Sequence, residues 1–156
     1  MGLYNELHRD FALRTRANLE HIDAAWAAQE KAGNERTVFN VTQLINSCLG
    51  MVVFIKESQY LPAGSIQDFC PEIDFETLQD ERNSNDSLQQ FIRRFRNAIS
   101  HCHIEAYGNA GDIVGFRLWD GPPNGEINWK IEMGTDSIRA LADALVNHVL
   151  ENAPQG

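Results

Sequence analysis

The chain has 156 residues, of which 43% are hydrophobic, and it carries a formal net charge of −9. This length and composition predict one globular domain over residues 1–156. There is no apolar run long enough to cross a membrane and no secretory signal, so we expect a cytoplasmic protein without membrane contact. The acidic charge argues against transcription factors and against proteins that coat nucleic acid broadly.

Apolar residues at helical spacing predict two long helices in the first part of the chain. The first covers about residues 3–31, and the second covers about residues 37–58. The second is apolar nearly all round, which is typical of a helix at the centre of a bundle. Residues 59–85 lose this rhythm, and we expect a long connection there with short helical turns near residues 65–68 and 75–79.

The third predicted helix, about residues 86–103, is the most basic segment of the chain. Asp86 followed by Gln89 has the spacing of a capping box at a helix start. One side of this helix is an apolar stripe made of Phe91, Phe95, Ala98, Ile99 and Cys102. The opposite side carries polar and charged residues, namely Arg93, Arg94, Arg96, Asn97, Ser100 and His101.

The last third of the chain changes period and then returns to a helical pattern. Residues 113–120 and 127–133 alternate between apolar and polar, with turn residues between them, and predict a two-stranded β-hairpin over about residues 113–133. The glycine-bearing residues 105–111 are predicted to form a turn, and a final helix is predicted over about residues 136–152. The fold class is therefore mainly α, an antiparallel four-helix bundle with a β-hairpin inserted before the last helix.

The cysteines do not indicate a disulfide scaffold or a metal site. Cys48, Cys70 and Cys102 lack CxxC spacing, and the first and last of them lie on apolar helical faces, where we expect them to be buried. The His101-Cys102-His103 run offers three ligand types, but adjacent residues of a helix point in different directions and cannot bind one ion together. No metal and no other cofactor is predicted.

The third helix contains an arginine followed directly by an asparagine and, three residues later, a histidine: Arg96, Asn97 and His101. This pattern resembles the RNxxxH signature of the HEPN superfamily, and the order of predicted elements resembles small HEPN proteins of plasmids and defence loci. Arg16 and His21 have the same spacing, but no asparagine follows Arg16 and their helix is an ordinary amphipathic one.

The resemblance implies a metal-independent endoribonuclease, a toxin or defence effector that acts on RNA as a homodimer and that an antitoxin protein can accompany. It implies catalytic roles for Arg96, Asn97 and His101. The chemistry of these residues agrees, because imidazole transfers protons at neutral pH and guanidinium binds two phosphate oxygens. Asn97 can orient the imidazole or hold a phosphate oxygen. The RNA-binding candidates beside them are Arg93, Arg94 and Ser100.

The geometry of an α-helix indicates whether one chain or two chains form the catalytic site. Arg96 and His101 are five residues apart, so their side chains leave a regular helix roughly 140° apart. One helix presents them poorly to a single phosphate unless the arginine folds round or the helix ends before His101. Two such helices related by a two-fold axis can bring the arginine of one copy to the histidine of the other, which predicts a composite site in a homodimer.

Structural interpretations of the same residues remain open. Arg96 can pair with a surface carboxylate, Asn97 can be a solvated helix residue, and His101 can offset the negative end of the helix dipole. Arg93 and Arg94 can form a solvated face, and His103 can be structural or exposed. The tryptophans are interpreted as core and interface anchors in preference to base-stacking platforms: Trp26, Trp119 and Trp129.

Two other functions are weighed beside the nuclease. One is a non-catalytic HEPN module that binds a nucleotide, RNA or a partner protein. The other is a structural dimerisation bundle whose acidic surface serves protein contacts. RNA cleavage that survives EDTA and depends on His101 distinguishes the nuclease from both alternatives.

Overall fold

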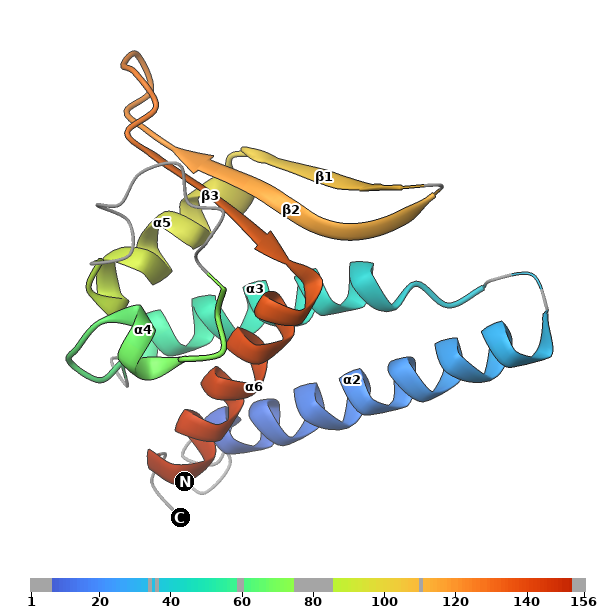
Figure 1. Ribbon diagram of the computed structural model, residues 1–156. Helices are drawn as coiled ribbons and strands as arrows, with labels where there is room; N and C mark the ends of the chain where they lie inside the picture. The colour runs from blue at the N-terminus through green and yellow to red at the C-terminus, as the bar shows by residue number, and fades with distance from the viewer. Residues whose placement is uncertain are drawn as a thin grey trace.

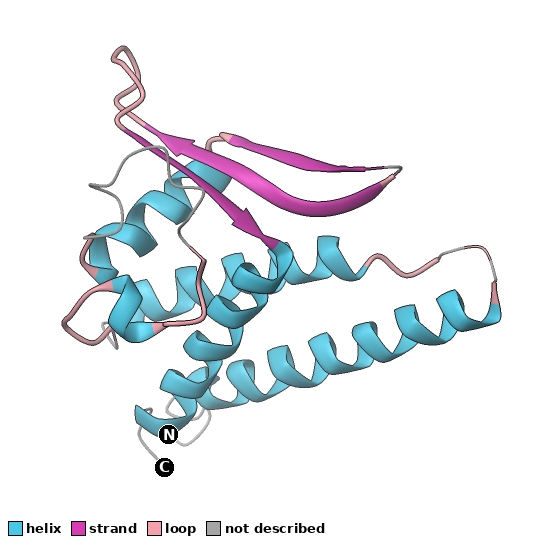
Figure 2. Ribbon diagram, viewed as in Figure 1, coloured by secondary structure: helices cyan, strands magenta, loops and turns pink. Residues whose placement is uncertain are grey.

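The computed structural model describes residues 7–33, 35, 37–58, 61–74, 86–109 and 111–152. These residues form a mainly helical protein with a small antiparallel sheet (Figures 1 and 2). The helices are α2 (Leu7–Ala32), α3 (Asn40–Ser58), α4 (Ile66–Phe69), α5 (Leu88–Ser100) and α6 (Thr135–Asn152). The strands are β1 (Ile104–Asn109), β2 (Asp112–Asp120) and β3 (Trp129–Gly134). None of the helices in this described part is both long and apolar enough to span a bilayer.

A helix stands at each of the four positions where the sequence predicts a long one. The beginning of the first predicted helix, residues 3–6, lies outside the described residues. The predicted turn near residues 65–68 is α4, whereas the one near residues 75–79 also lies outside the described residues. The helices α2, α3 and α6 pack on one another in pairs, and α5 packs on α3 and β2.

The predicted two-stranded hairpin is wrong in its number of strands, because the sheet has three strands in the order β1-β2-β3. The strand β1 occupies most of the segment predicted to be a turn, residues 105–111. Four of its six residues are exposed, so it lacks the alternation that marks a half-buried strand. Its glycine is required by packing, since a Cβ on Gly108 would lie 1.8 Å from the carbonyl oxygen of Asp112.

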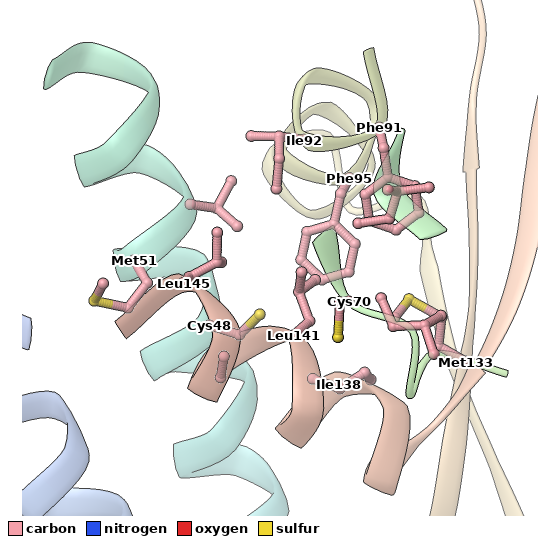
Figure 3. Packing of buried hydrophobic residues seen from close by; sticks show 14 of the residues in the cluster. Cys48, Met51, Cys70, Phe91, Ile92, Phe95, Met133, Ile138, Leu141 and Leu145 are labelled. Atoms are coloured by element: carbon pink, nitrogen blue, oxygen red, sulfur yellow. The ribbon is translucent and has the colours of Figure 1, made fainter. Parts of the chain in front are cut away.

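The hydrophobic core lies between α3, α5, α6 and the inner face of the sheet (Figure 3). The α5 helix contributes Phe91 and Phe95, both fully buried, and the ring of Phe91 meets that of Trp129 edge to face with centroids 5.9 Å apart. Burying two such aromatic side chains supplies several kcal/mol of stabilisation, about 1.5–3 kcal/mol each. This packing fixes the rotation of α5 and so leaves its polar side at the surface.

The cysteines divide into two buried thiols and one exposed thiol. Burial raises the pKa of Cys48 to about 12 and that of Cys70 to about 11, so both stay protonated at neutral pH. The prediction that Cys48 is buried is confirmed. The same prediction for Cys102 is wrong, because α5 ends at Ser100 and the chain turns outward there.

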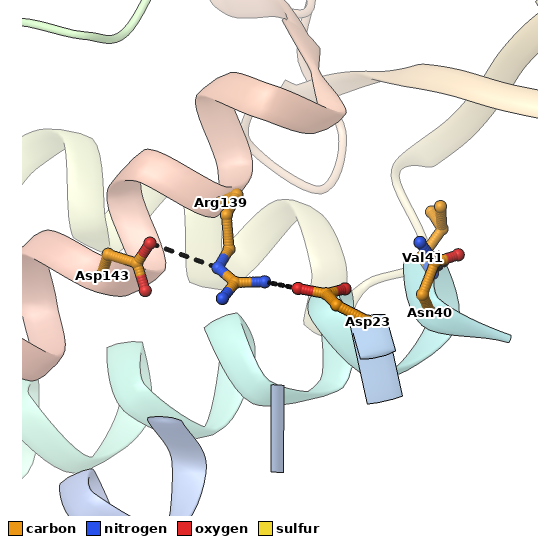
Figure 4. A network of polar contacts seen from close by, with 5 residues as sticks. All are labelled: Asp23, Asn40, Val41, Arg139 and Asp143. Atoms are coloured by element: carbon orange, nitrogen blue, oxygen red, sulfur yellow. Dashed lines mark hydrogen bonds and ion pairs between the residues drawn. The ribbon is translucent and has the colours of Figure 1, made fainter. Parts of the chain in front are cut away.

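Polar contacts join the long first helix to the last one. Arg139 of α6 pairs with Asp23 of α2, and its Nε also donates to Asp143 at 3.2 Å (Figure 4). Arg16 of α2 donates to the side-chain oxygen of Asn147 on α6. The alternative arginine–histidine pair on α2 therefore has its arginine in a contact that holds two helices together.

The capping box of α5 stands one residue later than predicted. Ser87 Oγ accepts from the backbone N–H of Gln90 at 3.2 Å, and the side chain of Gln90 accepts from the N–H of Ser87. Asp86 is instead 8% exposed, and its carboxylate accepts from the indole Nε1 of Trp129 at 3.1 Å. The residue before the cap thus ties the start of α5 to the sheet.

Burial raises the pKa of Asp86 above its ordinary value of 3.8, although the charge of Arg94 and the indole hydrogen bond oppose the rise. The folded chain therefore binds this proton more readily than the unfolded chain, so the ionised carboxylate lowers stability above the raised pKa. We expect the unfolding free energy of the wild type to rise, relative to Asp86→Asn, as pH falls from neutral toward 3.8. Urea unfolding of both proteins across pH measures this; parallel curves would contradict it.

Candidate functional site

The C-terminal end of α5 is a Schellman motif, which sets the direction of the motif histidine. The N–H of His103 donates to the carbonyl oxygen of Ala98 at 2.7 Å, and the N–H of Cys102 donates to that of Ile99 at 3.1 Å. Cys102 stands at the left-handed position with φ of 58°. His101 is the C-cap and is exposed, so its imidazole lies on the surface at the last turn of the helix.

Cys102 occupies a backbone conformation that glycine adopts at lower cost. We expect Cys102→Gly to raise the unfolding free energy by about 0.5–1 kcal/mol, since relief of backbone strain exceeds the entropy that glycine adds to the unfolded chain. Thermal or urea unfolding measures the change, and Cys102→Ala serves as the control that removes the thiol while keeping a side chain. Equal stability of the glycine and alanine variants would contradict this explanation.

The six predicted site residues all lie on the side of α5 that faces away from its buried aromatic residues. Arg93, Ser100 and His101 are exposed, while the other three are half-buried. Helical spacing makes neighbours of Asn97 and His101 and of Arg96 and Ser100, and Asn97 and Ser100, three residues apart, also lie on one face. α5 ends at Ser100 and His101 is its C-cap, with φ of −96° and ψ of 8°, so the angle of roughly 140° predicted for a regular helix does not carry over to Arg96 and His101.

The amide of Asn97 is held by a residue that the sequence did not indicate. Its Nδ2 donates to the carboxylate of Asp120, at the end of β2, over 3.3 Å. A carboxylate only accepts, so this bond fixes which end of the amide faces the strand. It also places a negative group beside the amide nitrogen, which disfavours a phosphate oxygen there. Asn97 is thereby suited to position its neighbours more than to bind an anion.

Aromatic rings continue from the motif onto the sheet. The rings of His101 and His103 have centroids 5.9 Å apart, and the ring of His103 stacks on that of Trp119 at 5.7 Å and 17°. Trp119 is half-buried on the outer face of β2, whereas Trp129 is buried in the core. Trp129 is therefore a core anchor, as predicted, whereas Trp119 lies outside the core and its role as an interface anchor stays a prediction.

The three arginines of α5 differ in their surroundings. Arg93 is exposed, and Arg96 is half-buried. Arg94 lies close enough to Asp86 for its charge to act against the rise in the pKa of that carboxyl. Arg94 is thus partly committed to a structural carboxylate, whereas the exposed Arg93 can meet a phosphate that arrives from solvent.

Two surface cavities lie elsewhere on the molecule. One, of about 450 Å³, lies between the end of α2, the start of α3 and the β1–β2 turn. The other, of about 590 Å³, lies between α4 and α6 and has an acidic lining. Neither of these two cavities is lined by a motif residue. Within the described ranges, no group of three or more His, Cys, Asp or Glu residues is arranged to hold a metal ion.

Comparison with protein families gives a match over nearly the whole chain. The family model described as HEPN pEK499 p136 matches residues 1–155. Comparison with curated proteins finds no significant match, and comparison with solved structures also finds none. The matched span includes α5 and its motif, the sheet and the last helix.

Proposed function

We propose that this chain, which belongs to the HEPN pEK499 p136 family, is a metal-independent endoribonuclease. The observation that carries the proposal is the RNxxxH motif on the solvent side of a helix whose rotation is fixed by its buried aromatic face. His101 is exposed at the helix end, one turn after Asn97. An exposed imidazole at the end of a helix that also carries three arginines suits RNA cleavage by its own 2′-hydroxyl.

The proposed reaction is a transesterification within the RNA. The 2′-oxygen attacks the adjacent phosphorus while an imidazole takes the 2′ proton, and the bond from phosphorus to the 5′-oxygen breaks. The departing 5′-oxygen takes a proton, which leaves a 2′,3′-cyclic phosphate and a 5′-hydroxyl. Arg96 neutralises the charge that builds on the non-bridging oxygens. Asn97 is held by Asp120, and its backbone carbonyl accepts from the N–H of His101 at 2.9 Å.

A homodimer completes this site in the proposal. Arg96 lies within α5 and His101 caps its end, and a second copy related by a two-fold axis can bring its Arg96 to this His101. Each of the two sites then holds one imidazole, which accepts the 2′ proton, and the departing 5′-oxygen takes its proton from solvent. A toxin or defence role, with an antitoxin as protein partner, is the biological setting that we propose for this activity.

The test is cleavage of single-stranded and structured RNA by the purified chain in excess EDTA. We expect cleavage that does not depend on divalent metal and products that end in 2′,3′-cyclic phosphate. Absence of cleavage by a folded protein would favour the second candidate, a non-catalytic RNA-binding module. The carboxylate of Asp120 beside the motif is the observation that favours that second candidate, because it repels phosphate.

A further inference from the structure

The outer face of the sheet lies on the side away from the helices (Figure 1). Leu118 and Ile131 face one another across β2 and β3 and are buried in the core. Their neighbours along each strand point the opposite way, since side chains alternate. The outer face therefore carries His103, Glu105, Tyr107, Arg117, Trp119, Lys130 and Glu132.

The aromatic rings and the guanidinium group on this face are held in place by contacts with one another. His103 stacks on Trp119 with only 17° between the ring planes, and the backbone N–H of Trp119 donates to the carbonyl of His103 at 3.1 Å. Farther along the same strands, the guanidinium carbon of Arg117 lies 5.3 Å from the centre of the Tyr107 ring. The His103–Trp119 pair and the Arg117–Tyr107 pair form a row along β1 and β2, and this row begins next to His101.

The charge on this face is nearly balanced. Arg117 Nε donates to Glu132 at 2.7 Å, and Glu105 lies 3.8 Å from the same guanidinium. The hydrogen bond to Glu132 holds the planar fork of Arg117 in place and raises its pKa. This surface can therefore bind a ligand through its aromatic and guanidinium planes, whereas it has little net positive charge to attract an anion. Its chemistry suits unpaired bases, which stack on aromatic and guanidinium planes, and not the phosphates of a duplex.

We infer that the outer face of the sheet is a stacking platform for unpaired bases of single-stranded RNA, beginning at the His103–Trp119 pair next to the motif. The inference rests on the proposed function for its site of cleavage and adds the class of substrate. It also accounts for RNA recognition by an acidic chain, since stacking supplies affinity that does not depend on neutralising many phosphates.

The experiment measures binding of a fluorescent, fully 2′-O-methylated single-stranded oligonucleotide, which cannot be cleaved because it lacks the attacking hydroxyl. We expect Trp119→Ala to weaken binding by about 5- to 150-fold, the cost of losing one stacked base. Trp119→Phe should retain most of the affinity. Trp26→Ala, which removes a half-buried tryptophan from α2, should leave the affinity unchanged. A blunt duplex of the same sequence should bind more weakly than the single strand.

Salt dependence separates stacking from phosphate contacts. We expect Trp119→Ala to lower affinity without changing the slope of log affinity against log salt, whereas Arg93→Ala should reduce that slope by about 1. Quenching of tryptophan fluorescence by the single strand should disappear in Trp119→Phe, a variant that keeps a ring in place and reports independently of the alanine variant. Unchanged affinity in a folded Trp119→Ala, or equal affinity for the duplex, would overturn the inference.

The outcomes also separate this inference from the nuclease proposal. Binding that depends on Trp119 without cleavage of any RNA would support the platform and contradict the nuclease. Cleavage in EDTA with affinity and rate unchanged in Trp119→Ala would support the nuclease and contradict the platform.

Discussion

Replacing His101 with alanine is expected to lower the rate of RNA cleavage in EDTA by roughly 10²–10⁴-fold, the usual contribution of a general acid or base. The side chain is exposed at the C-cap of α5, so its removal should change the unfolding free energy by no more than about 0.5 kcal/mol. Initial rates on a labelled single-stranded RNA, with urea unfolding of the same preparations, measure both effects. A rate that stays within a few-fold of the wild type would remove His101 from the reaction.

His21 provides a matched control within the same chain. It is exposed on a helix and stands five residues after Arg16, the spacing that separates Arg96 from His101. Arg16, however, is engaged with Asn147 on α6 and no asparagine follows it. We expect His21→Ala to cleave RNA at the wild-type rate. An equal loss in the two variants would show that imidazole content, and not the motif, governs the measured activity.

The side of α5 that carries the motif could be predicted from sequence because burial and helical period act together. Phe91, Phe95 and Ala98 recur at a spacing that places them on one face, and all three are fully buried. The opposite face must then remain at the surface, whatever the details of the neighbouring helices. A helix with this strong a pattern leaves little freedom in its rotation.

The end of the same helix could not be predicted in this way. The left-handed residue after a helix is usually glycine or asparagine, and such a residue in the sequence predicts the helix end. Here Cys102 has the left-handed conformation, so the sequence contains no such indication. The predicted helix consequently continues to residue 103, although the real one ends at Ser100. The difference is functional, because the early end exposes Cys102 and directs His103 toward the sheet.

Two further features of the site depend on contacts between distant residues. The bond between Asn97 and Asp120 joins residues that are 23 positions apart, and no local pattern links them. The stacking of His103 on Trp119 depends on β1, an edge strand whose mostly exposed residues have no periodic signal. Sequence patterns thus predicted the helix that presents the motif, whereas the surroundings of the motif required the tertiary structure.

Mixing two inactive variants tests the composite site directly. Arg96→Ala should lower cleavage by about 10²–10³-fold, since it removes the group that stabilises charge on the phosphate. If each site takes Arg96 from one copy and His101 from the other, a dimer of Arg96→Ala with His101→Ala contains one complete site and one empty site. Half of randomly exchanged dimers are mixed, so we expect roughly a quarter of the wild-type activity to return. The measurement is the cleavage rate after unfolding and refolding the two variants together.

Restoration of activity cannot arise if both groups act within one chain, because every site in the mixture then lacks one of them. Combining both substitutions in one chain and refolding it with wild type gives the opposite test. In a composite site, each mixed dimer then has one site without the arginine and one without the histidine, so activity should fall to about the quarter of dimers that are wholly wild type. Sites within single chains would instead retain about half of the activity. These two mixtures distinguish a shared site from a separate one, even where the dimer itself is unaffected by the substitutions.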